Sequence, residues 1–204
     1  GDTGMRAGGA EILDELGFRD APESVARDAI ALLEAPNCPE GRMDMLLSPD
    51  QMVLQIHESI GHPLELDRIL GDERNYAGTS FVTPEMFGSY RYGSDLLNVT
   101  FAPDIGAEVG AYAYDDLGTP ARREYLIRNG ILERPLGGRT SQARANLAGV
   151  ANERASSWNR PPIDRMANLN LEPGNQSFGD LVGAVERGVY METLIDSPLR
   201  PKIR

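Results

Sequence analysis

The segment 48–63 constrains the fold most, because it carries both a start and a stop signal for a helix. Ser48 is a capping residue, the proline after it suits the first helical position, and a glutamine follows that can close a capping box. Gly61 is typical of a helix end, and the proline two residues later disfavours helical geometry for the residue before it. We therefore predict a helix over 49–60 that stops at Gly61, with His62 in an extended conformation.

Elsewhere, apolar periodicity and turn signals predict a mixture of helices and strands. Helices are expected over 22–33 and 178–189, and strands over 42–47, 98–102 and 108–114. Residues 125–132 are typical of a hairpin, because Asn129-Gly130 is a favoured two-residue turn between apolar runs. The polar, glycine-bearing stretch 71–92 is expected to be a loop. Together these elements indicate an α+β fold with a mainly antiparallel sheet.

The net charge of the chain limits the classes of partner that it is expected to bind. It holds 31 acidic and 20 basic residues, a formal net charge of -11. An acidic surface is repelled by nucleic acids and by anionic membranes, so we expect neither as a partner. No apolar run reaches the roughly 18 residues that span a bilayer. The single cysteine, Cys38, excludes an internal disulfide, which fits the reducing cytoplasm.

The two histidines of the chain, His57 and His62, flank Glu58 in the run His57-Glu-Ser-Ile-Gly-His62. Neutral imidazole is a preferred nitrogen ligand of zinc, and a neighbouring carboxylate can accept a proton from water that the metal activates. In the common H-E-x-x-H motif the histidines lie one helical turn apart, whereas here the spacing is one residue longer. The pattern indicates a zinc site with two histidine ligands and Glu58 as general base.

The longer spacing requires a departure from regular α-helix. Five residues turn the direction by roughly 140° beyond a full circle, so the two rings would not share a face of a regular helix. The helix could widen into a π-bulge, or it could end at Gly61 and let His62 swing back toward the metal. The glycine and the proline after His62 favour the second arrangement. On the pattern alone, two ordinary histidines at a helix end remain the alternative.

Four segments, in order, are similar to segments of the TldD/PmbA family, also described as modulators of DNA gyrase. They are His57–Glu65, Asp116–Pro120 together with Leu126–Leu132, Pro162–Asn168 and Val185–Tyr190. The first resembles the family's metal segment. The resemblance covers most of the chain, and four ordered motifs are far more specific than one.

This resemblance implies a cytoplasmic zinc metallopeptidase of the TldD-like branch, with a fold of the family's C-terminal type. That branch binds zinc through H-E-x-x-x-H and a cysteine near the C-terminus, so matching positions make His57 and His62 ligands and Glu58 the catalytic base. Short or unfolded peptides are the implied substrates. The implied assembly is a homodimer, or a heterodimer with a PmbA-like subunit that lacks the metal motif.

The sequence departs from the family pattern in two respects. Family members are longer, with an N-terminal domain, and their ligand cysteine is expected soon after Thr193, where this sequence has none. We therefore interpret residues 1–204 as a partial metallopeptidase core domain that lacks both the N-terminal domain and the cysteine segment. Glu65, three residues beyond His62, is a candidate either for the third ligand or for an acceptor that orients a histidine.

Four further side chains are candidates for substrate binding: Arg160, Arg165, Tyr90 and Tyr92. The arginines could hold a peptide carboxylate or a transition-state oxygen, with surface or structural ion pairs as the alternative. The tyrosines, on a glycine-bearing loop, could line a cleft or pack at the base of the loop.

The sequence thus predicts zinc-dependent hydrolysis of peptide bonds in short or unfolded peptides. Two other functions stay open. One is a non-catalytic PmbA-like partner subunit, or peptide-binding module, that retains a relic of the metal motif. The other is a metal-stabilised structural module, for which a closed site with four ligands would be expected.

Overall fold

The computed structural model describes residues 8–192, which fall into two compact units. The larger unit is Gln55–Asn175, and the smaller comprises residues 8–54 and 176–192. Helices and strands are mixed and the largest sheet is antiparallel, which confirms the predicted α+β class. None of the helices in these residues is both long enough and apolar enough to cross a bilayer.

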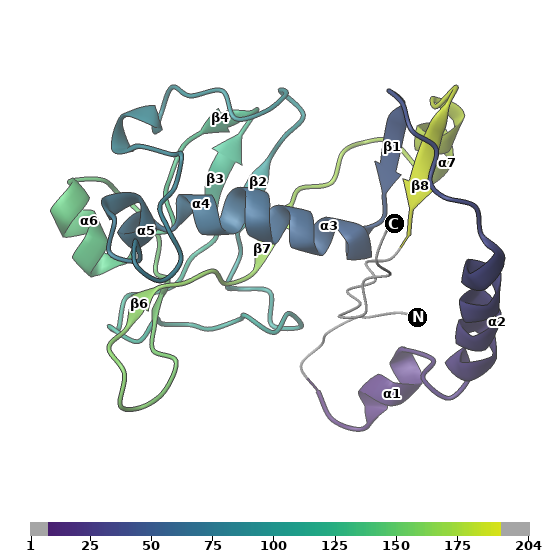
Figure 1. Ribbon diagram of the computed structural model, residues 1–204. Coiled ribbons are helices and arrows are strands. Elements are labelled where there is room, and N and C mark those ends of the chain that lie inside the picture. The colour runs from purple at the N-terminus through teal and green to yellow at the C-terminus, as the bar shows by residue number, and fades with distance from the viewer. Residues whose placement is uncertain (1–7, 193–204) are drawn as a thin grey trace. The chain divides into compact units, whose positions relative to one another are not determined.

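A four-stranded antiparallel sheet forms the centre of the larger unit, in the order β4-β3-β2-β7 (Figure 1). Its strands are β2 (Val99–Phe101), β3 (Glu124–Arg128), β4 (Ile131–Leu132) and β7 (Leu169–Leu171). The hairpin between β3 and β4 confirms the predicted turn. Asn129 and Gly130 have φ angles of 49° and 75°, the left-handed conformation that a two-residue hairpin turn requires at both positions.

A helical run packs against this sheet and closes the core. Ile60 and Leu64 from the run join buried side chains of the sheet in one apolar cluster, among them Val99, Phe101 and Leu126. All of these except Ile60 are fully buried, and burying one such side chain stabilises a fold by about 1.5–3 kcal/mol. The part of the run that belongs to the larger unit is therefore fixed to the sheet through Ile60 and Leu64.

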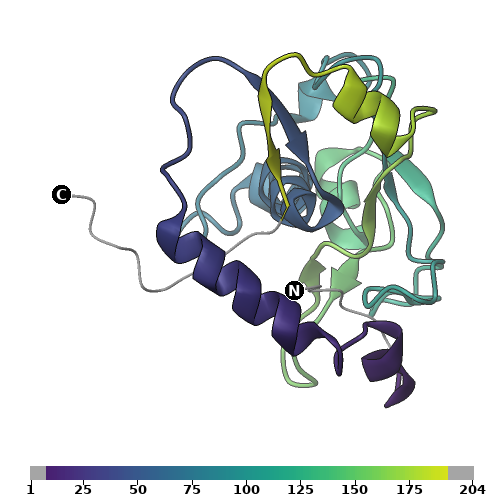
Figure 2. The same ribbon diagram turned by 90° about the vertical axis from the view of Figure 1, so that its right-hand side faces the viewer.

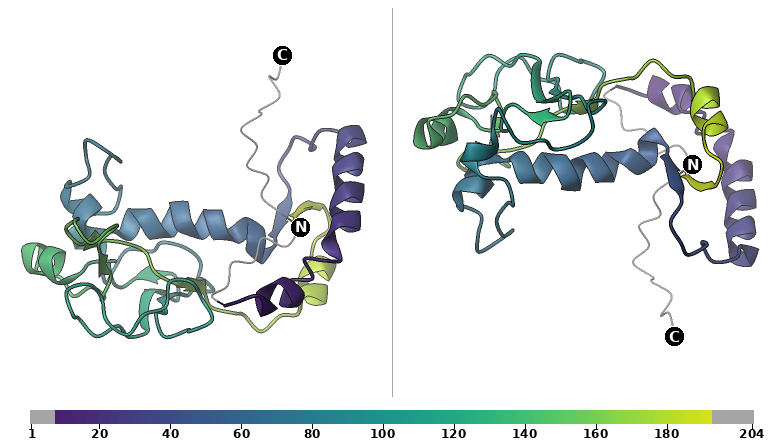
Figure 3. Two further views of the ribbon diagram at one scale, coloured as in Figure 1. Left: turned by 90° about the horizontal axis from the view of Figure 1, so that it is seen from below. Right: turned by 90° about the horizontal axis from the view of Figure 1, so that it is seen from above.

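The run comprises α3 (Pro49–Ile56), the π-helical segment η1 (His57–Gly61) and α4 (His62–Leu64). Its predicted start is confirmed, since the Ser48 hydroxyl accepts a hydrogen bond from the Gln51 N–H at 3.2 Å. Its predicted stop is wrong. His62 has helical angles, φ −58° and ψ −42°. Figure 3 shows the run as one continuous helix.

The helical run ends instead at Glu65, which is extended at φ −63° and ψ 116°. Here the chain pairs with a distant segment. The Leu136 N–H donates to the Leu64 carbonyl, and the Leu66 N–H donates to the Leu136 carbonyl, each at 2.8 Å. This pairing, rather than the glycine and proline signals, determines where the run ends. The helix α5 (Leu66–Leu70) then follows.

The remaining elements of the larger unit are short. They are η2 (Pro84–Met86), α6 (Arg139–Ala145) and the antiparallel pair β5 (Glu153–Arg154) and β6 (Ile163–Asp164). The predicted strand over 108–114 is wrong, because this stretch folds into successive turns. The Glu108 N–H donates to the Ile105 carbonyl, and the Ala111 N–H to the Glu108 carbonyl, at 3.0 and 3.2 Å.

The smaller unit contains α1 (Glu11–Glu15), α2 (Ala21–Glu34), α7 (Phe178–Gly183) and a parallel pair of strands. These strands, β1 (Asp44–Leu47) and β8 (Gly188–Met191), lie side by side in Figure 2. The predicted helix over 22–33 and strand over 42–47 are confirmed within a few residues. The predicted helix over 178–189 is too long, since it ends at Gly183 and Val189 pairs with Met45 in the strands.

Candidate metal centre

The two histidines lie on a π-helical turn, which is the arrangement that the sequence pattern disfavoured. The His62 N–H donates to the carbonyl of His57, five residues earlier. This wider turn brings residues five apart onto the same side of the helix, which a regular α-helix does not. The predicted departure from α-helix is thus confirmed, but it takes the form of a π-bulge rather than a helix end.

The turn brings three predicted side chains together. The Nε2 atoms of His57 and His62 are 2.9 Å apart, with the ring planes at 89° to each other. Glu58 places its Oε1 atom 3.9 Å from Nε2 of His57. One donor atom from each of the three lies within 4.8 Å of the other two. His57 and Glu58 are exposed to solvent, so a metal ion bound by these atoms would be accessible to a substrate.

Glu65 contacts the far side of the second imidazole. Its Oε2 atom lies 2.9 Å from Nδ1 of His62, and its side chain is fully buried. A carboxylate on Nδ1 accepts the ring proton and leaves Nε2 free to bind a metal, which is the usual support for a metal-binding histidine. Of its two predicted roles, this contact favours the orienting acceptor over the third ligand.

Charged side chains extend from Glu65, and the first of them also contacts the histidine, because Nη2 of Arg68 lies 3.2 Å from Nδ1 of His62. The Arg68 guanidinium lies 3.2 Å from Glu65 and 3.0 Å from Glu73. Arg165 lies 3.8 Å from Glu73 at the end of this chain of ion pairs. Arg165, a candidate for substrate binding, is thus placed within a network that reaches His62 through two other side chains, Glu73 and Arg68.

The two candidate tyrosines contribute differently. The Tyr92 hydroxyl donates to the carbonyl of Ser59, inside the π turn, at 2.5 Å. Burial, and to a smaller extent Tyr90, raises the pKa of Tyr92 to about 12, so the hydroxyl keeps its proton. Tyr90 packs edge-on against it at 6.1 Å between ring centroids and is 38% exposed. Tyr90 is therefore the one of the pair that faces solvent.

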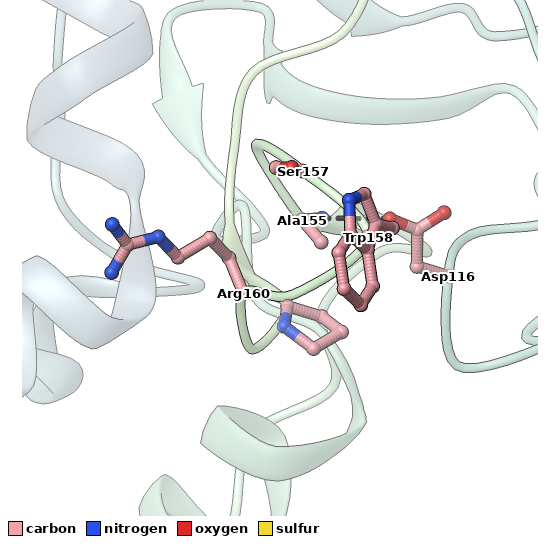
Figure 4. Close-up of a pocket in the computed structure, with 6 residues that line it drawn as sticks. Asp116, Ala155, Ser157, Trp158 and Arg160 are labelled. Carbon is pink, nitrogen blue, oxygen red and sulfur yellow. Dashed lines mark hydrogen bonds between the residues drawn. The ribbon is translucent and has the colours of Figure 1, made fainter.

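The remaining candidate, Arg160, lines an open pocket of about 470 Å³ (Figure 4). Trp158 beside it is 95% exposed. Across the pocket, Asp116 accepts a hydrogen bond from the Ala155 N–H at 2.7 Å. The Arg160 side chain extends away from Trp158 and Asp116. None of the six residues that line this pocket belongs to the His57–Glu58–His62 group.

A buried pair of carboxylates, Asp67 on α5 and Asp164 on β6, escaped the sequence analysis. Each carboxylate accepts the backbone N–H of the other residue, at 3.0 and 3.2 Å. Burial, followed by the charge of Asp164, raises the pKa of Asp67 to about 7. Burial also raises the pKa of Asp164. The one available signal was an aspartate inside the apolar run Leu66–Leu70.

A family model described as the PmbA/TldA metallopeptidase C-terminal domain matches residues 40–201. That range includes the whole His57–Glu58–His62 group, Glu65 and every candidate for substrate binding. The match rests on more than three-quarters of the chain, so it covers both the metal motif and the sheet beneath it.

Two named relatives share this region. A metalloprotease of Methanocaldococcus jannaschii is 32% identical over 164 residues, which cover 80% of this chain and 34% of that protein. A zinc metalloprotease TldD homolog of Saccharolobus solfataricus is 25% identical over 181 residues, covering 88% of this chain and 39% of the relative. The chain thus spans little more than a third of the length of these curated relatives.

The fold also has counterparts among solved structures. TldE from Thermococcus kodakarensis matches with a TM-score of 0.62 and 16% identity, over 76% of this chain and 33% of that one. At such low identity the match shows a shared fold, and function has to be argued from the site.

Proposed function

Because this chain belongs to the PmbA/TldD metallopeptidase family, we propose that it carries out zinc-dependent hydrolysis of peptide bonds in short or unfolded peptides. His57 and His62 are the proposed zinc ligands, and Glu58 is the proposed general base. The proposal depends on one observation, the approach of the two Nε2 atoms to 2.9 Å at a solvent-facing position.

The donor set fits zinc. Two nitrogens that each lie about 2.0–2.1 Å from a tetrahedral zinc ion are about 3.3 Å apart, close to the separation of the two imidazoles here. The orienting carboxylate on His62 is also typical of zinc sites. Two histidines alone leave further coordination positions for another ligand, for water and for substrate.

Each residue of the group has a distinct task in the proposed reaction. Zinc, when bound, supplies a Lewis acid that polarises a peptide carbonyl and acidifies water. Glu58 accepts the proton of the attacking water through its exposed carboxylate and delivers it to the departing amine. Glu65 accepts a hydrogen bond from Nδ1 of His62 and so holds the proton on that nitrogen. The lone pair of Nε2 is then free and points toward His57. The exposure of Glu58 leaves room for an extended peptide beside it.

The assembly belongs to the same proposal. We place the active form in the cytoplasm, as a homodimer or as a heterodimer with a PmbA-like subunit. The shared fold with TldE supports a partner built on the same plan. Since this chain spans about a third of its relatives' length, substrate choice and the third zinc ligand are assigned to the assembled protein.

Zinc content and peptide cleavage test the proposal together. The assembled protein, purified intact, should bind zinc by elemental analysis and cleave a fluorogenic unfolded peptide. Glu58→Gln should retain the zinc and lose about 100- to 10,000-fold in cleavage rate, because the general base is removed. Glu133→Gln, an exposed carboxylate of the same unit, is the matched control and should change neither property.

The outcomes separate the alternatives. A fully active Glu58→Gln protein would remove the general base from the mechanism. A protein that binds unfolded peptides without zinc and without cleavage would support the non-catalytic module instead. His57→Ala and His62→Ala should each lose zinc, and retention of zinc in both variants would place the metal elsewhere.

A further inference from the structure

We infer that Tyr92 is a positioning residue for the proposed zinc site, because its hydroxyl replaces a backbone donor that Pro63 cannot supply to the π turn. The inference rests on the proposed function for the identity of the metal. It concerns what holds the backbone between the two histidines in its π-helical conformation, a question that the choice of zinc ligands does not answer.

The sequence shows which carbonyl lacks a donor in α-helical register. In regular α-helix each carbonyl accepts the N–H four residues later. For Ser59 that residue is Pro63, which has no N–H. Ser59 is half-buried, and a carbonyl shielded from water without a partner is costly, so another donor is expected. The Tyr92 hydroxyl fills this position, 2.5 Å from the Ser59 oxygen.

Tyr92 is itself held in place from two sides. Its backbone N–H donates to the Gly130 carbonyl in the β3–β4 turn at 2.8 Å. Its ring packs against the apolar core and lies 5.8 Å from the ring of Phe81. Because Tyr92 is attached to the sheet at one end and to Ser59 at the other, it sets the position of the turn relative to the sheet.

The contact point lies between the two ligands, two residues after His57 and three before His62. A regular α-helical register through this stretch would rotate the His62 ring by roughly 100° about the helix axis relative to the π turn. The two Nε2 atoms would then separate. The hydrogen bond that Tyr92 donates to the Ser59 carbonyl therefore helps to set the distance between the two Nε2 atoms, on which the proposed site depends.

The hydroxyl keeps this role over the working range of pH. Burial holds the pKa of Tyr92 at about 12, so the group remains a donor throughout neutral conditions. Tyr90, on the same loop, offers a matched comparison. Its ring is part of the same aromatic group, but among residues 8–192 the hydroxyl that donates to the Ser59 carbonyl is that of Tyr92 and not that of Tyr90.

Tyr92→Phe tests the inference, with Tyr90→Phe as control. Zinc affinity, measured by competition with a chelating dye, should fall by about tenfold or more in Tyr92→Phe, as is typical when support of a metal ligand is removed. Cobalt(II) substituted for zinc should show a changed visible absorption spectrum in that variant. Tyr90→Phe should match the parent in both measurements.

A second readout requires no metal. In the metal-free protein, the His62 amide should exchange with deuterium faster in Tyr92→Phe than in the parent, relative to core amides of β3. A merely structural effect would accelerate all of these amides together. Equal zinc affinity and equal His62 exchange in the parent and Tyr92→Phe would overturn the inference.

Pro63→Ala supplies the rescue, because it restores a backbone N–H at residue 63. In a double-mutant cycle, Tyr92→Phe should cost less zinc affinity in the Pro63→Ala background than in the parent. An equal cost in both backgrounds would contradict the replacement of a missing donor. If the parent binds no zinc, the proposed function fails, and the His62 exchange rate still decides whether Tyr92 holds the turn.

Discussion

The Met166 sulfur occupies the place where a side chain on Gly61 would begin. A Cβ atom built on Gly61 would collide with the Sδ atom of Met166. Any larger residue at position 61 would have to displace the end of the Met166 side chain, so the glycine permits close packing at the end of the π turn and does not act as a helix stop. Without a side chain at position 61, the backbone of the π turn packs directly against Met166, which contacts the apolar core.

Gly61→Ala should therefore destabilise the protein and disturb the site. Overpacking of this kind costs about 1–3 kcal/mol, and denaturant unfolding measures it directly. Zinc affinity should fall with it, because the displaced backbone carries His62. Gly61→Ala with Met166→Ala should recover part of the lost stability, whereas an unchanged loss in the double variant would exclude the collision as its cause.

Glu65→Gln should weaken zinc binding without removing the fold. The amide keeps the size of the side chain but accepts the His62 Nδ1 proton less strongly, so zinc affinity should fall about 10- to 100-fold. Isothermal titration with zinc measures the change. Glu73→Gln, which alters the other partner of Arg68, is the control and should have a much smaller effect on affinity.

Stability should depend on pH through Asp67. Its pKa in the folded protein is about 7, above the usual value of 3.8, so the folded state holds a proton that the unfolded chain releases near pH 4. The stabilisation is complete below pH 4 and is lost as the pH rises through 7. The free energy of unfolding should thus fall between pH 4 and pH 7, by roughly a few kcal/mol.

Asp67→Asn checks this assignment. The amide cannot ionise, so the fall in unfolding free energy over that pH range should become shallower. Urea titrations at pH 5, 6, 7 and 8 give the comparison. The same slope in both proteins would assign the titration to another group.

Arg160 and Arg165 should respond differently to removal. Arg160→Ala, at the open pocket, should raise KM for a peptide substrate by up to about tenfold with kcat unchanged, if the pocket binds peptide. Arg165→Ala should change KM little, because its contact is with Glu73. Steady-state kinetics on one fluorogenic peptide separates the two, and an unaltered KM in Arg160→Ala would exclude the pocket from substrate binding.

The sequence predicted those features that depend on neighbouring residues. The Ser48 cap, the Asn129-Gly130 turn and the class of the fold follow from local signals, and the structure confirms each. The grouping of His57, Glu58 and His62 was also expected, because the three share one short segment.

Features that depend on distant residues could not be predicted. The glycine and proline around His62 are ordinary stop signals, but Met166 explains the glycine from 105 residues away along the chain, and Tyr92 compensates for the proline from 29 residues away. The buried Asp67–Asp164 pair joins positions 97 residues apart. A short sequence pattern cannot predict such contacts, because they form between residues far apart in the chain and can override local conformational propensity.

The π turn also bears on how such a centre differs genetically from the commoner H-E-x-x-H helix. A π turn is what an α-helix becomes when it absorbs one inserted residue and keeps its register on either side. Loss of the codon for Ser59 would shorten the motif to His-Glu-Ile-Gly-His, whose imidazoles already face the same way on a regular helix. A single in-frame deletion therefore separates the two kinds of motif.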